Sequence, residues 1–212
     1  MVEENVVIKA PEFRTATFEI DGTSPYVQLR MTEKARNQMR VNMETGQRLK
    51  KGRLHEARNF EPEFEASMYK TPEGWHGINA AAFRNGMISA CRIVGFQMTK
   101  AKLSVFIEAD GFDVLDGTPL VRIYGEPERY ESVTRNANLS ADIRTRAMWR
   151  KWSARLVVRW DADQFNITDV TNLLARVGLQ VGIGEGRPDS KTSNGLGFGL
   201  FTVSKVHYER FE

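Results

Sequence analysis

The stretch Leu179–Val203, LQVGIGEGRPDSKTSNGLGFGLFTV, holds six of the 17 glycines of the chain. Apolar residues alternate with these glycines, which is not the composition of a flexible linker: Val181, Ile183, Leu196, Phe198, Leu200 and Phe201. Glycine accepts positive φ angles and lets another backbone segment come close. The stretch therefore predicts a shaped, glycine-rich loop between two strands near the carboxyl end of the chain.

Such a loop is a candidate anion site, because successive backbone N–H groups can form a concave surface that binds phosphate. Gly184 and Gly186 are the candidate backbone contacts, and Arg187 and Lys191 add positive charge. Two familiar nucleotide loops do not match. Ser190 stands where the P-loop requires its second glycine, and Arg187 stands where the dinucleotide fingerprint requires its third. The stretch therefore does not predict an NTPase or a dinucleotide-dependent dehydrogenase.

The composition is that of an ordinary soluble protein, with 41% hydrophobic and 27% charged residues among 212. No apolar run approaches the roughly 20 residues of a membrane span, and the first residues lack the layout of a signal peptide. The single cysteine, Cys91, leaves no intrachain disulfide and fits a reducing compartment, so we expect a cytoplasmic protein. The formal charge is only +3, so a basic surface must come from how the charges are distributed.

We expect residues 1–212 to form a single domain with two basic insertions, near 34–58 and 125–152. Residues 30–58 contain nine Lys and Arg against three acids, and residues 128–159 contain eight against three. A charge run of this kind is typical of solvated surface. It is equally typical of an arm that meets a phosphate backbone. Both interpretations stay open for the two insertions.

The second insertion contains Trp149-Arg150-Lys151-Trp152, with Arg144 and Arg146 just before it. Aromatic rings among basic side chains suit a single-stranded nucleic acid, because bases stack on the rings while the cations contact phosphates. The alternative is that both tryptophans anchor a hairpin to the core. The sequence does not decide between these two roles.

Hydrophobic patterning and turn residues predict strands near 6–10, 16–20, 26–29, 64–70, 102–108, 120–124, 154–160, 181–183 and 199–208. A short helix is expected from Met31 with Thr32 as its N-cap, and a longer one over 80–94 between Asn79 and Gly95. A further helix is expected over 169–177, between Thr168 and Gly178.

The helix over 80–94 has one apolar stripe, made by Phe83, Met87, Cys91 and Val94. Cys91 on that stripe is expected to be a small buried hydrophobe and not a nucleophile. Strand–helix–strand units on both sides of the second insertion predict an α+β fold. We expect a ferredoxin-like (RRM-like) antiparallel sheet with two helices, a glycine-rich C-terminal loop and long basic insertions.

The run LARVG followed by VGIGEGRP and NGLGFGLFTV resembles the glycine-rich loop and final strand of the RAMP superfamily, the RRM-like RNA-binding proteins of CRISPR effector complexes. The run GINAAAFRNGMISACRIVG is similar to that superfamily's small-residue turn followed by a helix with a basic residue. The likeness covers 79–95 and 168–203. Residues 78–81 are Ile-Asn-Ala-Ala where the family often carries Pro-Gly-Ser-Ser, and the chain is short for a CRISPR backbone subunit. A compact, phage-encoded relative is therefore also compatible with the likeness.

The resemblance implies a protein that binds single-stranded RNA, or else DNA, and oligomerises along the strand as a subunit of a nucleoprotein complex. It implies that the basic insertions form an arm and a thumb, and that the glycine-rich loop holds phosphates with Arg187 and Lys191 as charge partners. It also implies contacts from basic side chains of the middle helix and of the second insertion: Arg84, Arg92, Arg144, Arg146, Arg150, Lys151 and Trp152. No cofactor or metal is expected.

Two other classes of function stay open. Some members of the superfamily are metal-independent endoribonucleases that use a histidine, and His55 and His76 are the candidates here. The other class is a structural or assembly protein, for instance of a phage particle, in which the glycines serve only close strand packing. Such a protein would have no affinity for nucleic acid.

Overall fold

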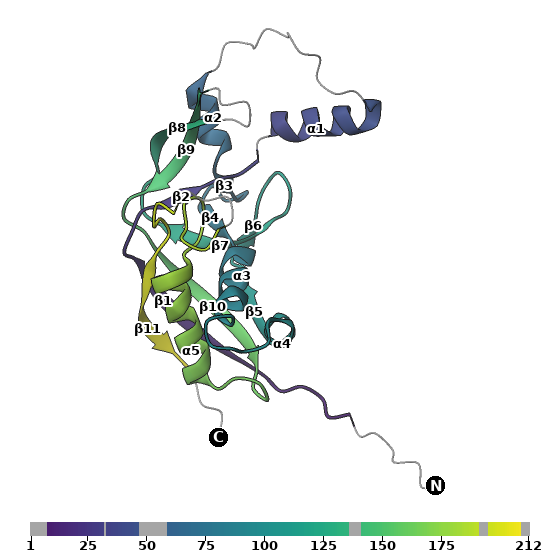
Figure 1. Ribbon diagram of the computed structural model, residues 1–212, viewed down its shortest axis with the longest axis vertical. Coiled ribbons are helices and arrows are strands. Elements are labelled where there is room, and N and C mark those ends of the chain that lie inside the picture. Colours follow the sequence, from purple (N-terminus) through teal and green to yellow (C-terminus); the bar gives the residue numbers. More distant parts are fainter. Residues whose placement is uncertain (1–7, 32, 47–58, 136–140, 191–194, 209–212) are drawn as a thin grey trace.

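The computed structural model describes residues 8–31, 33–46, 59–135, 141–190 and 195–208 (Figure 1). Its largest feature is a sheet of eight strands whose recorded pairings are all antiparallel. The main strand order is β11 (Phe201–His207), β1 (Phe13–Gly22), β10 (Ser153–Asp161), β7 (Pro119–Tyr124), β4 (His76–Asn79) and β3 (Tyr69–Lys70). Off this path, β5 (Val105–Glu108) pairs with β10, and β6 (Gly111–Phe112) pairs with β7. The predicted α+β class with an antiparallel sheet is confirmed.

The two central strands, β1 and β10, form because apolar and polar residues alternate along both of them. The buried side chains of β1 lie directly across from buried side chains of β10: Ala16 from Val158, Phe18 from Leu156, and Ile20 from Ala154. The residues between them face the other side of the sheet. This alternation is what predicted strands at 16–20 and 154–160, and both strands extend somewhat further than predicted.

Helices α3 (Ala80–Ala90) and α5 (Ile167–Arg176) contact each other on one face of this sheet (Figure 1). The side chain of Asn79 caps α3 by accepting from the amide of Ala81, as the sequence predicted. The expected stripe of Phe83, Met87 and Cys91 is buried. Val94 is exposed, because α3 ends at Ala90 instead of reaching 94.

The described residues form five α-helices where the sequence predicted a core with two. Outside the two core helices, α1 (Glu33–Thr45) agrees with the short helix expected from Met31. Helices α2 (Phe60–Ala66) and α4 (Met98–Ser104) were not predicted, and a π-helical turn, η1 (Val177–Val181), extends α5. Helix α2 and the turn after it take the place of most of the strand predicted at 64–70, because Asn59 caps the helix and two glutamates lie in its first turn. Every helix in the described ranges is too short or too polar to cross a bilayer.

The second basic insertion forms a hairpin of β8 (Glu128–Arg135) and β9 (Ala141–Trp149), and β9 also pairs with β2 (Tyr26–Gln28). In the first insertion, α1 projects away from the body of the molecule (Figure 1). Residues 47–58 lie outside the described part of the chain.

Four other sequence predictions need correction. Residues 8–10 form no strand, and residues 181–183 belong to η1 and the loop after it. The cap of α5 is Asn166 and not Thr168, because the side chain of Asn166 and that of Asp169 bond reciprocally to each other's backbone amides. Gly178 does not end the helical segment, which continues through η1.

Candidate functional site

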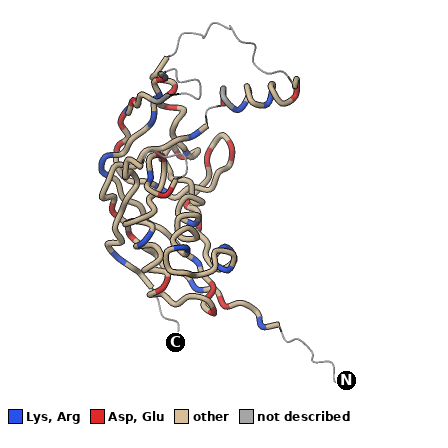
Figure 2. Tube along the Cα trace, viewed as in Figure 1, with Lys and Arg blue, Asp and Glu red and all other residues tan. Residues whose placement is uncertain are grey.

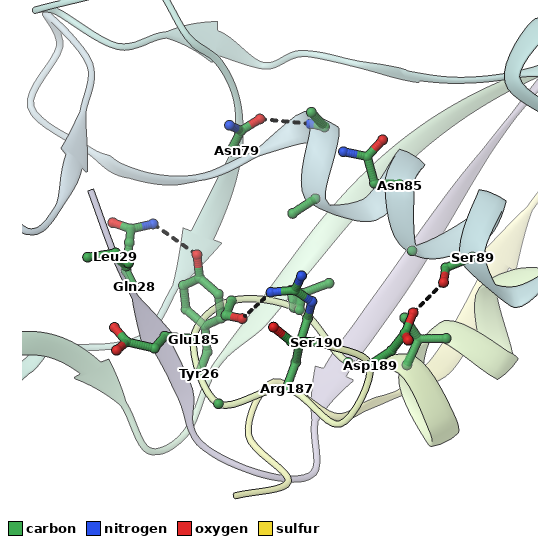
Figure 3. A pocket seen from close by; sticks show the side chains of 18 of the residues that line it. Tyr26, Gln28, Leu29, Asn79, Asn85, Ser89, Glu185, Arg187, Asp189 and Ser190 are labelled. Atoms are coloured by element: carbon green, nitrogen blue, oxygen red, sulfur yellow. Dashed lines mark hydrogen bonds between the residues drawn. The ribbon is translucent and has the colours of Figure 1, made fainter. Parts of the chain in front are cut away.

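A groove of about 720 Å³ lies between α3 and the glycine-rich loop (Figure 3). Asn79, Asn85 and Ser89 form one wall, which is the start of α3 and its exposed side. The opposite wall is residues 181–190, the loop that follows α5 and η1. Four further residues of α3 line the first wall: Ala81, Ala82, Gly86 and Ile88. The remaining lining residues come from other parts of the chain: Tyr26, Gln28, Leu29, Tyr69, Met98, Lys102 and Arg144. The groove is therefore a product of the tertiary fold.

Two glycines of the loop, Gly184 and Gly186, are required for close packing. A Cβ on Gly184, whose φ is 77°, would lie 2.5 Å from the carbonyl oxygen of Val27 and against the ring of Tyr26. A Cβ on Gly186 would lie 2.7 Å from the ring of Phe198. The amide of Glu185 donates to the carbonyl of Val27 at 2.9 Å, which fixes the loop to β2. These contacts account for Gly184 and Gly186 without a ligand.

Part of the loop's hydrogen-bonding capacity is nevertheless unused. The amides of Ile183, Glu185, Phe198 and Gly199 all donate to backbone carbonyls. Within the described residues, no acceptor is recorded for the amides of Gly184, Gly186 and Arg187. These three N–H groups are the ones that could bind an anion at the groove.

The two carboxylates of the groove wall are neutralised by arginines. Nε of Arg146 lies 2.6 Å from Oε2 of Glu185, and Nη2 of Arg92 lies 2.7 Å from Oδ1 of Asp189. The Ser89 hydroxyl also donates to Asp189, and these bonds hold the pKa of the Asp189 carboxyl below its usual range against the opposing effect of burial. The acids therefore contribute little net negative charge to the groove.

Three cations remain on the lining: Lys102 from α4, Arg144 from β9 and Arg187 from the loop. Arg187 donates to the carbonyl of Gly184 at 3.0 Å (Figure 3), and Nε of Arg144 is 3.9 Å from Oδ2 of Asp142. Among the described residues, neither Lys102 nor Arg187 has an ion-pair partner. Elsewhere, acidic and basic residues are interspersed along the trace in the view of Figure 2.

Several residues that sequence reasoning placed on nucleic acid have other partners. Arg84 donates to the carbonyls of Val105 and Lys102 and lies over the ring of Phe106, so it fastens α3 to the α4–β5 segment. Arg150 pairs with Glu128 at the base of the hairpin, away from the groove. Lys151 is exposed outside the groove lining. Arg92 and Arg146 do not line the groove but pair with its two acids, Asp189 and Glu185.

Trp149 and Trp152 are not available for base stacking, because the core buries both of them. Trp149 is 0% exposed and Trp152 is 5% exposed. The indole N–H of Trp152 donates to the carbonyl of Ser24 at 2.8 Å, and its ring packs between Tyr26 and Phe201. The alternative interpretation of these tryptophans as anchors of the hairpin is the correct one.

Of the two candidate histidines, His76 is described and does not line the groove. His76 is half-buried on β4 with its ring edge-on to Trp149, and burial, followed by the charge of Lys70, lowers its pKa. His55 and Lys191 lie outside the described residues. In the described ranges, no group of His, Cys, Asp and Glu side chains is placed to hold a metal ion.

Sequence reasoning missed Asn85, Lys102 and Gln28. Asn85 lies off the buried stripe of α3, a signal that could have marked it as a residue facing a ligand. Gln28 is buried and bonds the hydroxyl of Tyr26, the carbonyl of Gly77 and the amide of Tyr69, so it fixes one end of the groove. No protein-family model matches the chain, and no curated protein sequence matches it either.

Proposed function

We propose that this protein binds single-stranded nucleic acid, RNA in the first place, in the groove between α3 and the glycine-rich loop. The observation that carries the proposal is the charge of the groove: Lys102, Arg144 and Arg187 line it, while its two acids are neutralised by Arg92 and Arg146. A surface of this kind attracts a phosphate backbone, because each contacted phosphate releases counterions.

The proposal assigns separate roles to the two walls. On one side, the backbone N–H groups of Gly184, Gly186 and Arg187, for which no acceptor is recorded among the described residues, donate to phosphate oxygens. On the other side, the Asn85 amide presents one acceptor and two donors that suit the edge of an unstacked base. The hairpin of β8 and β9 lies beside the groove and contributes Arg144 to it.

The core of the sheet is proposed to be ferredoxin-like (RRM-like). Strands β11, β1, β10 and β5 lie in this order and pair antiparallel. Helix α3 falls between β1 and β5 in the chain, and α5 falls between β10 and β11. Two strand–helix–strand units with this strand order are what the ferredoxin-like arrangement requires. The other strands and helices are insertions into that core.

The resemblance to the RAMP superfamily supports the same assignment, since the glycine-rich loop lies between α5 and β11, as in the family. We propose a non-catalytic, homo-oligomeric binder in the cytoplasm, with neighbouring copies side by side along the strand. The position of α1, which projects from the body, suits a contact with a neighbour. Among the described residues that line the groove there is no histidine.

The test is a fluorescence-anisotropy titration of labelled 15-nucleotide RNA and DNA at several salt concentrations, with a gel to detect cleavage. We expect salt-dependent binding of an intact strand, with Lys102→Ala and Arg144→Ala each reducing the slope of log K against log salt by about one. Arg150→Ala is the matched control, because Arg150 pairs with Glu128 outside the groove. It should leave the slope unchanged.

Three results would contradict the proposal. Absence of binding at low salt would indicate a structural protein whose glycines serve packing alone. Cleavage of RNA without added metal, lost in His76→Ala, would indicate a nuclease. A protein that stays monomeric on long strands in light scattering would contradict the oligomeric part.

A further inference from the structure

The face of the sheet opposite α3 and α5 is not covered by any described helix. Alternate residues of β10 show this: Leu156 and Val158 are buried, while Arg155 is exposed and Val157 and Arg159 are only partly buried. The same alternation holds in β1, where Phe18 is buried and Thr17 and Glu19 are not. An antiparallel sheet with one solvated face is common, so the open face alone indicates no ligand.

One place on that face is nevertheless hollowed. A cleft of about 230 Å³ is lined by five residues: Trp75, Asp110, Arg122, Tyr124 and Arg155. We call it the aromatic cleft. The guanidinium of Arg122 is 5.8 Å from the centre of the Trp75 ring and 5.3 Å from that of Tyr124. Tyr124 is 47% exposed and Trp75 is partly exposed, so solvent reaches both rings.

In the described part of the chain, neither arginine of the cleft, Arg122 or Arg155, forms an ion pair. Asp110 uses Oδ2 to accept the backbone amide of Arg122 at 2.8 Å, so it holds the strand and does not pair with a guanidinium. Glu19, directly across from Arg155 on β1, is 2.6 Å from Nε2 of His207 instead. Two unpaired cations therefore lie beside two accessible rings.

We propose that the aromatic cleft binds one nucleotide unit of a single-stranded nucleic acid. The base stacks on Trp75 or Tyr124, and the phosphate pairs with Arg122 and Arg155. Stacking on exposed aromatics together with cationic contacts to the backbone is the combination that binds single strands. The charge of the two free guanidinium groups complements the phosphate.

This inference rests on the proposed function and extends it to a second contact on the same strand. Trp75 directly precedes β4, and Asn79, the last residue of β4, lines the groove. The four residues of β4 span about 13 Å at the rise of a strand. Because the groove lies on the α3 side of the sheet and the cleft on the opposite face, a single strand that occupied both sites would also have to pass around the edge of the sheet.

The tryptophans of this chain make the cleft directly observable. Trp75 is the partly exposed one, whereas Trp149, Trp152 and Trp160 are at most 5% exposed. A base stacked on Trp75 should quench its fluorescence, and the buried three should not respond. The experiment is a titration of the unmodified chain with unlabelled 12-nucleotide oligo(U) and oligo(dT), followed by intrinsic tryptophan fluorescence, with free UMP in parallel.

We expect saturable quenching by the oligonucleotides, absent in Trp75→Phe. Trp75→Ala should weaken anisotropy-monitored binding by roughly 5- to 150-fold, the loss of one stacked base. Arg155→Gln should shift the quenching midpoint to higher concentration, and Arg150→Ala should not. Because Arg155 is exposed, Arg155→Gln should fold normally, so it still tests the cleft if a Trp75 variant fails to fold.

Each other outcome overturns the inference in a recognisable way. If oligonucleotides bind by anisotropy but leave Trp75 fluorescence unchanged, the cleft is no contact and the groove proposal survives. If neither signal responds, both proposals fall. If UMP quenches Trp75 as strongly as the oligonucleotides at equal nucleotide concentration, the cleft is a free-nucleotide site and not a strand contact.

Discussion

Nη2 of Arg30 lies 2.7 Å from Oδ2 of Asp113, and both side chains are buried, at 3% and 1% exposure. The oxygens of Asp113 also accept the amides of Lys70, Leu115 and Asp116. This one carboxylate therefore joins the segment after β2, the strand β3 and the turn before β7. Nε of Arg30 is buried with no partner among the described residues, so the ion pair is incompletely satisfied.

Asp113→Ala should destabilise the protein by about 3–5 kcal/mol, because it leaves the buried charge of Arg30 without a partner. The measurement is the free energy of unfolding from urea denaturation at pH 7. The double variant Arg30→Met with Asp113→Ala should be less destabilised than Asp113→Ala, since the orphaned charge is gone. If the two variants were equally stable, the charge of Arg30 would not destabilise the protein in the absence of Asp113.

Gly199 and Gly197 form a matched pair for separating steric overlap from backbone strain. Both have positive φ, 70° and 73°. A Cβ on Gly199 would overlap the carbonyl oxygen of Ile183, whereas one on Gly197 would have nothing within 4 Å. Gly197→Ala should cost about 1–2 kcal/mol, the strain of a left-handed residue. Gly199→Ala should cost at least about 2 kcal/mol more. Urea denaturation measures the free energy of unfolding of both variants. Similar losses of stability in the two would mean that the loop can move away from Ile183.

The central strands and the two central helices were predictable from sequence, because their signals are local. In β10, apolar residues alternate over the whole strand, and Asn79 caps α3 immediately before a regular apolar stripe. The segment 64–70 was wrongly predicted as a strand, because its alternation of apolar and polar residues suits one. The decisive residue, Asn59, lies upstream of it and starts a helix.

The site was predictable only in part. The glycine-rich loop could be recognised from its composition alone. The roles of the arginines could not, because they depend on partners far away in the chain. Arg92 pairs with Asp189, 97 residues later, and Arg146 pairs with Glu185, 39 residues later. No local pattern distinguishes such a neutralised arginine from Arg144, which faces the groove. Burial of Trp152 likewise depends on contacts with Tyr26 and Phe201 at opposite ends of the sequence.

Asp189 should make the stability of the loop depend on pH. Bonds from Ser89 and Arg92 depress the pKa of the Asp189 carboxyl in the folded state, so its contribution is present above the unfolded pKa of about 4. That contribution is lost as the pH falls through the depressed value. Asp189→Asn should therefore be less stable than the natural chain at pH 7, and the difference should shrink below about pH 4. Urea denaturation between pH 2.5 and 7 measures this, and a difference that does not vary with pH would contradict it.

Trp152→Phe tests the structural role of the tryptophan that the sequence associated with nucleic acid. The substitution leaves the carbonyl of Ser24 without the indole donor and a void next to Tyr26. We expect a loss of about 1–3 kcal/mol in the free energy of unfolding. The affinity of the folded variant for a single-stranded 15-mer should stay unchanged, because the buried ring is not reached by a base.

Trp75→Phe is the matched control for stability. Because the Trp75 ring is partly exposed, this substitution should change the free energy of unfolding by less than about 0.5 kcal/mol. If the Trp152→Phe protein kept its full stability but bound the 15-mer more weakly, the result would show that Trp152 contacts nucleic acid.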